Sequence, residues 1–291
     1  DPQNRLCLCS NRSMIRALAA LFIAIASIFT YCTGTAENPV TGEKQRVGLT
    51  VQQEVAVGQQ AIGPLMKAHG GLLPNQKVQD KVDEIGAKLV AALGTDLPYQ
   101  FSFHALNDPE TVNAFALPGG QICITRALLI KLESESQLAA ILAHETSHVV
   151  ARHSSEQVAR RKLSLGLSGA AVIATYDPRN PQSRAQMAIL VSELANMKFS
   201  RSDELEADSL GVKLLSDAGY RPEAMLEVIQ ILEESSNGSP PEFLSTHPTS
   251  ENREQKILEA LDNLRASRAE LHLVMNTPWE SRPESVLPSH N

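Results

Sequence analysis

The stretch AAILAHETSHVVARHSS (residues 139–155) places two histidines and a glutamate inside a run that is otherwise apolar and helical in its spacing. Polar side chains inside a buried helix cost free energy unless other groups satisfy them. The stretch therefore predicts one of two things. Either these side chains pair with other protein groups, or they hold a metal ion.

The two histidines have the spacing of a metal site. His144 and His148 are four residues apart, so we expect their side chains on one face of a helix, one turn apart. Two imidazoles at that separation can bind one zinc ion, and Glu145 can reach a water on the same metal. The pattern HExxH thus favours a catalytic zinc site over a pair of structural histidines. His153 is expected on the same helix as a buried hydrogen-bonding residue rather than a ligand.

A catalytic zinc needs a third protein ligand, and a downstream acidic segment offers one. In SRSDELEADSLG (residues 200–211), Glu204 and Asp208 are one helical turn apart, whereas Glu206 projects to roughly the opposite side. Glu204 as a ligand and Asp208 as the acceptor of an imidazole N–H would complete the site. The alternative is a solvated helix N-terminus, where the helix dipole favours carboxylates.

The composition of the chain supports a folded domain with this kind of site. Of its 291 residues, 43% are hydrophobic and 20% are charged, which is enough to bury a core. A formal net charge of -7 without a cluster of Lys and Arg argues against binding to nucleic acid. Only Cys123 of the four cysteines lies in the body of the chain, so His and carboxylate groups must supply the metal ligands.

The N-terminal region predicts export. Arg16 precedes an apolar run (17–32) that is short for a membrane span, and small residues follow it. Two outcomes stay open: cleavage after Ala36, and lipid or uncleaved anchoring with Cys32 as the candidate lipid site. The expected division is a targeting segment over 1–36, a folded domain that contains the metal site over 37–275 and a proline-containing tail over 276–291.

The apolar pattern predicts an α+β fold that is mostly helical. Two helices are expected between Leu49 and Gly94. The apolar segment 163–174 is too short to cross a membrane, so we expect it to be a buried helix. From Glu133 onward the expected helices are 134–153, 155–174, 183–199, 202–218, 222–235 and 251–272.

A small antiparallel sheet is expected beside the HExxH helix. Strand-like alternation runs over 99–106 and 111–118, and a Gly-Gly pair then offers a hairpin turn. An exposed strand near a cleft can bind an extended peptide by strand addition, whereas an edge strand that other parts of the protein cover cannot. The candidate substrate platforms are Asn113, Ala114, Phe115 and Ala116, or residues 122–125.

Four segments together resemble one protein family. NAFALPGGQICITRALL, HETSHVVARHS, SRSDELEADSLG and HPTSENR occur in the order and wording of HtpX-like, CAAX-prenyl-protease-like zinc metallopeptidases, the gluzincin metallopeptidase family forty-eight. The resemblance covers about residues 38–265 and looks closest to an exported bacterial branch. The sequence up to Asn291 contains no tetratricopeptide repeats, which a related exported group carries. The resemblance implies a zincin-like domain with one zinc ion per chain.

The resemblance also implies a role for each motif residue. It makes His144, His148 and Glu204 the zinc ligands, Glu145 the catalytic base and Asp208 the orienting carboxylate. Two further residues come from the HPTSENR segment. His247 is implied to approach the zinc as a latch, and Arg253 to lie near the ligands or the oxyanion.

The implied function is a zinc endopeptidase for misfolded or misassembled envelope proteins, in the periplasm or at the periplasmic face of a bacterial membrane. One alternative is a zinc-stabilised chaperone or assembly factor with little or latched activity, and another is a chain whose HExxH binds nothing. Glu145 and Asp208 favour the peptidase, because a purely structural zinc needs neither. Natural substrates and oligomeric state stay undefined, and membrane association depends on the N-terminal segment.

Overall fold

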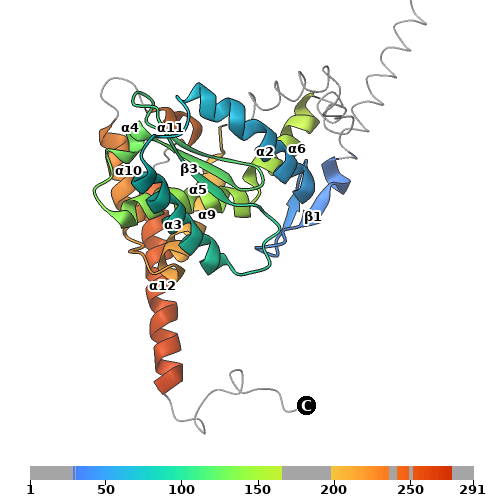
Figure 1. Cartoon of the computed structure of the whole chain (residues 1–291). Coiled ribbons are helices and arrows are strands. Elements are labelled where there is room, and N and C mark those ends of the chain that lie inside the picture. Colours follow the sequence, from blue (N-terminus) through green and yellow to red (C-terminus); the bar gives the residue numbers. More distant parts are fainter. Residues whose placement is uncertain (1–28, 30, 166–197, 236–240, 249–251, 277–291) are drawn as a thin grey trace, which may run out of the picture.

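The computed structural model describes residues 29, 31–165, 198–235, 241–248 and 252–276, and its elements are mainly helices (Figure 1). This agrees with the predicted α+β class. The remainder of the second helix expected after Glu133, and most of the third, lie outside the described residues. In chain order the elements are β1 (Thr35–Glu37), β2 (Lys44–Arg46), α2 (Val51–Ala68), α3 (Gln76–Leu93), β3 (Ser102–Leu106), β4 (Ala114–Leu117), β5 (Gln121–Thr125), α4 (Arg126–Leu129), α5 (Glu135–Val150), α6 (His153–Leu165), α9 (Arg201–Asp217), α10 (Ala224–Glu234), α11 (Glu242–Thr246) and α12 (Arg253–Asn276).

Helix α5 lies at the centre of the fold. It begins at the N-cap Ser134, whose side chain accepts a hydrogen bond from the N–H of Gln137. From Gln137 to Val150 every residue is buried, because α3, α9 and α10 and the sheet all pack against this helix. The HExxH segment therefore lies in the core, and its polar side chains must find partners there.

The three-stranded sheet beside α5 is mixed. Its order is β3-β5-β4, with β4 antiparallel to β5 and β3 parallel to β5. The hairpin was predicted correctly, but β3 corrects the expectation that every pair is antiparallel. The reason lies in the order of the strands, because β4 comes between β3 and β5 in the chain and reverses direction before β5 runs beside β3. The tight turn at Gly119-Gly120 brings β4 to one side of β5, and β3 fills the other side. Residues 122–125 thus lie in a central strand and offer no free edge for a substrate.

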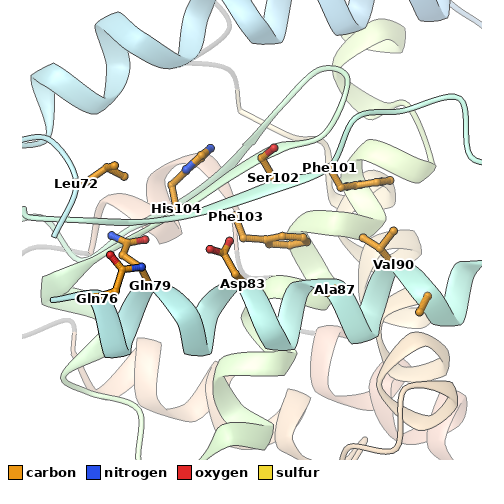
Figure 2. A pocket seen from close by; sticks show the side chains of 11 residues that line it. Leu72, Gln76, Gln79, Asp83, Ala87, Val90, Phe101, Ser102, Phe103 and His104 are labelled. Carbon is orange, nitrogen blue, oxygen red and sulfur yellow. The ribbon is translucent and has the colours of Figure 1, made fainter. Parts of the chain in front are cut away.

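The outer edge of β3 is partly closed by a side chain. A hollow of about 780 Å³ opens between β3 and α3, and Gln79 projects from α3 towards the strand (Figure 2). The Gln79 amide donates to the carbonyl of Ala105 at 2.7 Å and accepts from its N–H at 3.1 Å. A side-chain amide thus occupies the backbone groups that a neighbouring strand would use. Such blocking protects an edge strand from pairing with other chains.

The β1–β2 hairpin caps the C-terminal end of α5. The last carbonyls of a helix have no partner within the helix. Here Asn38 donates from Nδ2 to the carbonyl of Val150 at 2.8 Å, and Gln45 donates from Nε2 to the carbonyl of Ala151 at 2.7 Å. Both donors are buried. Residues far upstream in the sequence therefore help to hold the helix that carries HExxH.

Arg152 makes the turn between α5 and α6. Its φ is 60°, a left-handed conformation that costs a non-glycine residue about 1–3 kcal/mol. The buried guanidinium offsets this strain, since Nη2 donates to Oε1 of Glu54 at 3.0 Å and to the carbonyl of Leu49 at 2.9 Å. The turn ends α5 at Val150 and starts α6 at His153, which corrects the expectation of one continuous helix over 134–153.

The described part of the N-terminal region reaches into the fold. The expected cleavage position, after Ala36, lies within β1, and Cys32 is an exposed free cysteine just before it. Among the described residues, no helix combines the length and the apolar character that crossing a bilayer requires.

Candidate metal centre

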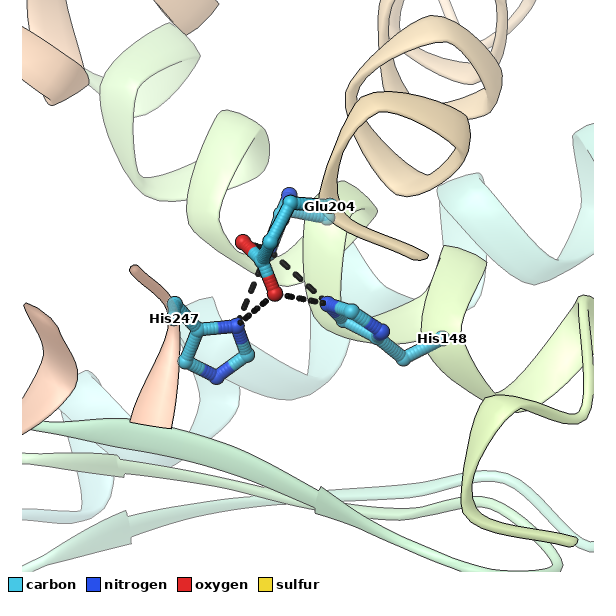
Figure 3. A group of neighbouring side chains, drawn as sticks. His148, Glu204 and His247 are labelled. Carbon is cyan, nitrogen blue, oxygen red and sulfur yellow. Dashed lines mark hydrogen bonds and ion pairs between the residues drawn. The ribbon is translucent and has the colours of Figure 1, made fainter. Parts of the chain in front are cut away.

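Four buried side chains from three parts of the chain meet at one point. His144 and His148 come from α5, Glu204 from α9, and His247 from the residue that follows α11. One donor atom from each of the four lies within 4.8 Å of the others. Figure 3 shows His148, Glu204 and His247 turned towards one another above the sheet.

The two HExxH histidines present the same ring nitrogen to this point. Nε2 of His144 lies 3.0 Å from Nε2 of His148. The carboxylate of Glu204 faces both nitrogens, with Oε2 at 3.5 Å from His144 and Oε1 at 3.4 Å from His148. Helical spacing brings the histidines together, and the packing of α9 along α5 supplies the glutamate more than fifty residues later.

The other nitrogen of His144 is held by Asp208. Nδ1 of His144 lies 2.9 Å from Oδ1 of Asp208, which fixes the ring so that Nε2 points to the centre. Burial opposes charge on both groups. Nevertheless the carboxylates of Asp208 and Glu204 raise the pKa of His144 to about 9, while Arg253 and His144 lower the pKa of Asp208.

Arg253 lies on the ligand side of the site. From the start of α12 it donates to both oxygens of Asp208, and its Nη2 is 3.2 Å from Oε2 of Glu204. Burial would raise the pKa of Glu204, but the neighbouring histidines, His247 foremost, hold it well below its usual range. Both carboxylates are thus kept ionised, as metal ligation and imidazole orientation require.

Glu145 is buried beside the cluster, next to the ring of His247. Neither of its carboxylate oxygens makes a hydrogen bond to any described residue. Burial raises its pKa, whereas the nearby His247 and His144 and the backbone of Ala116 favour the ionised form. Nε2 of His247 lies 3.5 Å from Oε1 of Glu145. A buried carboxylate without a hydrogen bond is costly, and such groups concentrate at functional sites.

The donor set fits a zinc ion. Three imidazoles and one carboxylate are nitrogen and oxygen ligands of the kind that zinc takes in fourfold coordination. Oε2 of Glu204 is buried and, beside its ion pair with Arg253, has no hydrogen-bond partner among the described residues, so a lone pair can still face a metal. Burial lowers the pKa of His148, and a neutral imidazole is the form that binds a metal.

His247 enters the site from a short helix that the sequence did not predict. Its Nδ1 lies 3.0 Å from Oε1 of Glu204 and 3.3 Å from Nε2 of His144. The ring stacks on Phe243 of α11, with centroids 4.3 Å apart. The N–H of Phe243 in turn donates to the carbonyl of Val112, just before β4. The segment that carries His247 is therefore fastened to the edge of the sheet.

The alternation of β4 shows which backbone groups face that edge. The carbonyl of Asn113 accepts from the N–H of Thr125, so Asn113 faces β5, and Phe115 follows two residues later in the same direction. Ala114 and Ala116 consequently turn their N–H and C=O groups to the free edge. Of the four residues in the expected platform, these two turn backbone groups away from β5, and Ala114 is fully buried whereas Ala116 is partly exposed.

His153 has a partner that sequence reasoning missed. It is buried, as expected, but its Nδ1 lies 2.8 Å from Nδ1 of His148, and its Nε2 lies 3.3 Å from Oε2 of Glu206. The prediction from helical spacing placed His153 on the same continuous helix as His144. The turn at Arg152 instead starts a new helix and directs His153 towards His148.

Comparisons with known proteins agree with this geometry. The model of peptidase family M48 matches residues 76–261. The chain is 31% identical over 222 residues to the beta-barrel assembly-enhancing protease of Yersinia pestis, which is 74% of this chain and 45% of that protein. With the protein of the same name from Escherichia coli (strain K12) it shares 29% over 253 residues, covering 83% and 51%. The mitochondrial metalloendopeptidase OMA1 of Schizosaccharomyces pombe is 31% identical over 244 residues, covering 82% and 70%. The chain thus spans about half the length of the two bacterial relatives.

Proposed function

The chain belongs to peptidase family M48, and from this premise we propose that it hydrolyses peptide bonds as a zinc-dependent endopeptidase. The observation that carries the proposal is the position of Glu145. Its carboxylate is buried beside the metal-ligand cluster, and both oxygens lack hydrogen-bond partners among the described residues. A purely structural zinc needs no such group, whereas hydrolysis needs a base.

Each residue of the site has a role in this proposal. His144, His148 and Glu204 would hold the ion, and Asp208 keeps His144 in the orientation that presents Nε2. When bound, zinc lowers the pKa of a water from about 15.7 towards about 7 and polarises a carbonyl group. Arg253 holds the two carboxylates of α9 in place through ion pairs, and its charge lowers the pKa of Asp208.

Glu145 moves the proton. It accepts a proton from the attacking water, whose oxygen bonds to the peptide carbonyl carbon, and it then donates that proton to the amine as the C–N bond breaks. Burial raises the pKa of Glu145, so its carboxyl group holds a proton more readily than an exposed glutamate does. This property suits a group that must first accept and then release a proton near neutral pH.

The free edge of β4 is the proposed substrate platform. An extended peptide would pair with the backbone of Ala116, the partly exposed residue of this edge, as in strand addition. The support is positional, since β4 packs against α5 and the backbone of Ala116 lies close enough to Glu145 to affect its pKa. A peptide on this edge would pass directly beside the base.

His247 is proposed to act as a latch. Its Nδ1 faces the ligand cluster and its Nε2 faces Glu145, so the ring occupies the space where a water would have to lie. The same segment uses the carbonyl of Val112 at the edge of the sheet. Release of this segment would open the metal and the platform together.

The relatives support a role in the cell envelope. Two of them carry the name beta-barrel assembly-enhancing protease, and the N-terminal region of this chain has the pattern of an export signal. We therefore propose that the protein belongs to the exported bacterial branch of the family. Its proposed substrates are misfolded or misassembled envelope proteins in the periplasm or at the membrane face.

A second candidate function is a zinc-stabilised assembly factor with little proteolytic activity. The observation in its favour is His247, because a fourth protein donor closes the coordination sphere in the way that is typical of structural zinc sites. Release of the latch separates the two candidates, since only a peptidase gains cleavage activity.

The Glu145→Gln variant tests the peptidase. Zinc content by mass spectrometry and cleavage of casein are measured for the wild type, for Glu145→Gln and for the exposed control Glu233→Gln. Glu145→Gln should keep one zinc per chain and lose cleavage, while the control keeps both. Retained cleavage in Glu145→Gln would refute its role as the base. Zinc binding without cleavage in both the wild type and His247→Ala would favour the assembly factor.

A further inference from the structure

We infer that His153, supported by Glu206, positions His148 for metal binding. Neither residue belongs to the cluster of metal donors or to HExxH, and the two lie on different helices, α6 and α9. The inference rests on the proposed function, because it concerns a ligand of the same zinc. It adds a second set of orienting hydrogen bonds, for His148, to the bond by which Asp208 orients His144.

The first step is to assign which nitrogen of each imidazole ring carries a proton. Nε2 of His148 faces His144 and Glu204, so Nε2 is the atom available to the metal. In a neutral imidazole the proton must then lie on Nδ1, which requires an acceptor. Nδ1 of His153, at 2.8 Å, is that acceptor.

The same reasoning assigns the proton at the other end of this series of hydrogen bonds, between His153 and Glu206. If Nδ1 of His153 accepts, its proton lies on Nε2, which is 3.3 Å from Oε2 of Glu206. The ring of His148 thus donates from Nδ1 and can bind the metal through Nε2, and the ring of His153 accepts at Nδ1 and donates from Nε2. This series of hydrogen bonds ends on the carboxylate of Glu206. Among the described residues, His148 has no carboxylate on its own Nδ1, in contrast to His144 with Asp208.

The hydrogen bond supplies what packing alone does not. Phe199 stacks on the ring of His148 with centroids 3.9 Å apart and planes at 22°. Stacking fixes the plane of the imidazole but not its orientation within that plane, since a 180° ring flip, which exchanges Nε2 with Cε1 and Nδ1 with Cδ2, preserves the stacked contact. The bond to His153 selects the orientation that presents Nε2.

The acceptor itself is fixed in place. His153 is fully buried, so no solvent competes for its Nδ1. It begins α6 directly after the left-handed turn at Arg152, whose guanidinium is bound to Glu54 and to the carbonyl of Leu49. The geometry that His148 needs is therefore built into the junction of α5 and α6.

Glu206 connects this series of hydrogen bonds to the surface. Its side chain is 37% exposed and lines a hollow of about 590 Å³, together with Ser147 of α5 and Glu43, which directly precedes β2. Because Glu206 is accessible, it can be replaced without opening a cavity in the core. A substitution of Glu206 therefore tests the series of hydrogen bonds from His148 to Glu206 in a protein that still folds.

Zinc affinity, measured by competition with a chromophoric chelator, is the primary test. His153→Leu leaves the Nδ1–H of His148 buried without an acceptor, and loss of such an orienting partner is expected to lower zinc affinity about 10–100-fold. His153→Asn places an amide oxygen near the position of Nδ1 and should retain an affinity within a few-fold of the wild type. His104→Leu is the matched control, because it removes a histidine of β3 that is hydrogen-bonded to Gln121 of β5, outside the metal cluster. It should bind zinc as the wild type does.

A second variant and a spectroscopic signal cover the case in which His153→Leu does not fold. Glu206→Ala should lower zinc affinity several-fold and shift the visible absorption of the Co²⁺-substituted protein, because the ligand geometry at His148 relaxes. Wild-type affinity and an unchanged cobalt spectrum in Glu206→Ala would overturn the inference. An equal loss in His153→Leu and His153→Asn would also overturn it, since only packing would then matter.

The outcomes also separate this inference from the peptidase proposal. A wild type that binds zinc but cuts no peptide, with weakened binding in His153→Leu, would refute the activity and support the positioning role. A wild type that binds no zinc would overturn both.

Discussion

Arg253 donates to both oxygens of Asp208, with its Nε 2.6 Å from Oδ2 and its Nη2 2.9 Å from Oδ1, and both side chains are buried. The same Nη2 lies 3.2 Å from Oε2 of Glu204. One cation at the start of α12 therefore serves two carboxylates of α9, the proposed ligand and the group that orients His144. The first helical turn of α12 is in this way part of the metal centre.

Arg253→Leu is expected to destabilise the protein strongly even without metal. The substitution leaves two carboxylates buried without their cation, which costs about 3–5 kcal/mol in free energy of unfolding. Urea denaturation in the presence of a chelator measures this difference. The control is Arg265→Leu on the same helix, where the pair with Glu223 is exposed and screened by solvent, so its loss should change stability little. Equal losses in the two variants would contradict the role given to Arg253.

His247→Ala is expected to raise basal proteolysis. Removing the imidazole frees the position that it holds between the ligand cluster and Glu145, so that a water can take its place. Initial rates of casein cleavage, at equal zinc content, provide the measurement. An unchanged or lower rate would count against the latch and for a role of His247 in holding the zinc.

Ala116→Pro should reduce peptide cleavage while the fold persists. The N–H of Ala116 faces the free edge of β4, so its loss spares the ladder with β5 but removes a donor beside Glu145. A single lost hydrogen bond of about 1.5 kcal/mol lowers kcat/KM about tenfold. Ala116→Gly, which retains the N–H, is the control and should cleave nearly as the wild type does. If both variants cleave normally, the substrate does not pair at this edge.

Asp108→Asn should lose stability in a pH-dependent manner. Burial would raise the pKa of Asp108, but hydrogen bonds from Thr111 and His69 lower it to about 2. A carboxyl group with a depressed folded pKa stabilises the protein above its unfolded pKa of about 3.9 and loses that contribution as the pH falls through about 2. The difference between wild type and variant, about 1 kcal/mol at pH 7 for this partly exposed group, should shrink between about pH 4 and pH 2.

Unfolding by urea at several pH values measures this difference. The exposed residue Asp96 supplies the control, and Asp96→Asn should differ little from the wild type throughout. A wild-type advantage over Asp108→Asn that stays constant down to pH 2 would show that the carboxylate charge is not what stabilises the loop.

The ligand arrangement could be predicted because it is local or strongly patterned. The spacing of His144 and His148 fixes their shared face once the helix is given, and the interval from Glu204 to Asp208 places both on one side of α9 in the same way. The buried character of α5 also follows from its apolar neighbours. These predictions need only helical periodicity and the cost of burying unpaired polar groups.

The remaining features depend on contacts that periodicity does not encode. The parallel pairing of β3 follows from which strand becomes central, and α11 is too short to leave a periodic signal. The role of His153 depends on a left-handed turn at Arg152, a residue type that rarely adopts that conformation. Each is set by tertiary partners distant in sequence, among them Glu54, Val112 and Glu206.

The hairpin cap on α5 has a consequence for where the independently folding unit begins. Asn38 and Gln45 close the end of the metal-binding helix, yet both precede residue 76, where the match to the family model starts. A fragment cut at that boundary would keep every proposed ligand but leave the carbonyls of Val150 and Ala151 uncapped and remove Glu54 from Arg152. We expect the smallest autonomous fragment with an intact centre to start before Asn38. The region matched by the family model therefore contains the proposed ligands but not all of the residues that hold their helix in place.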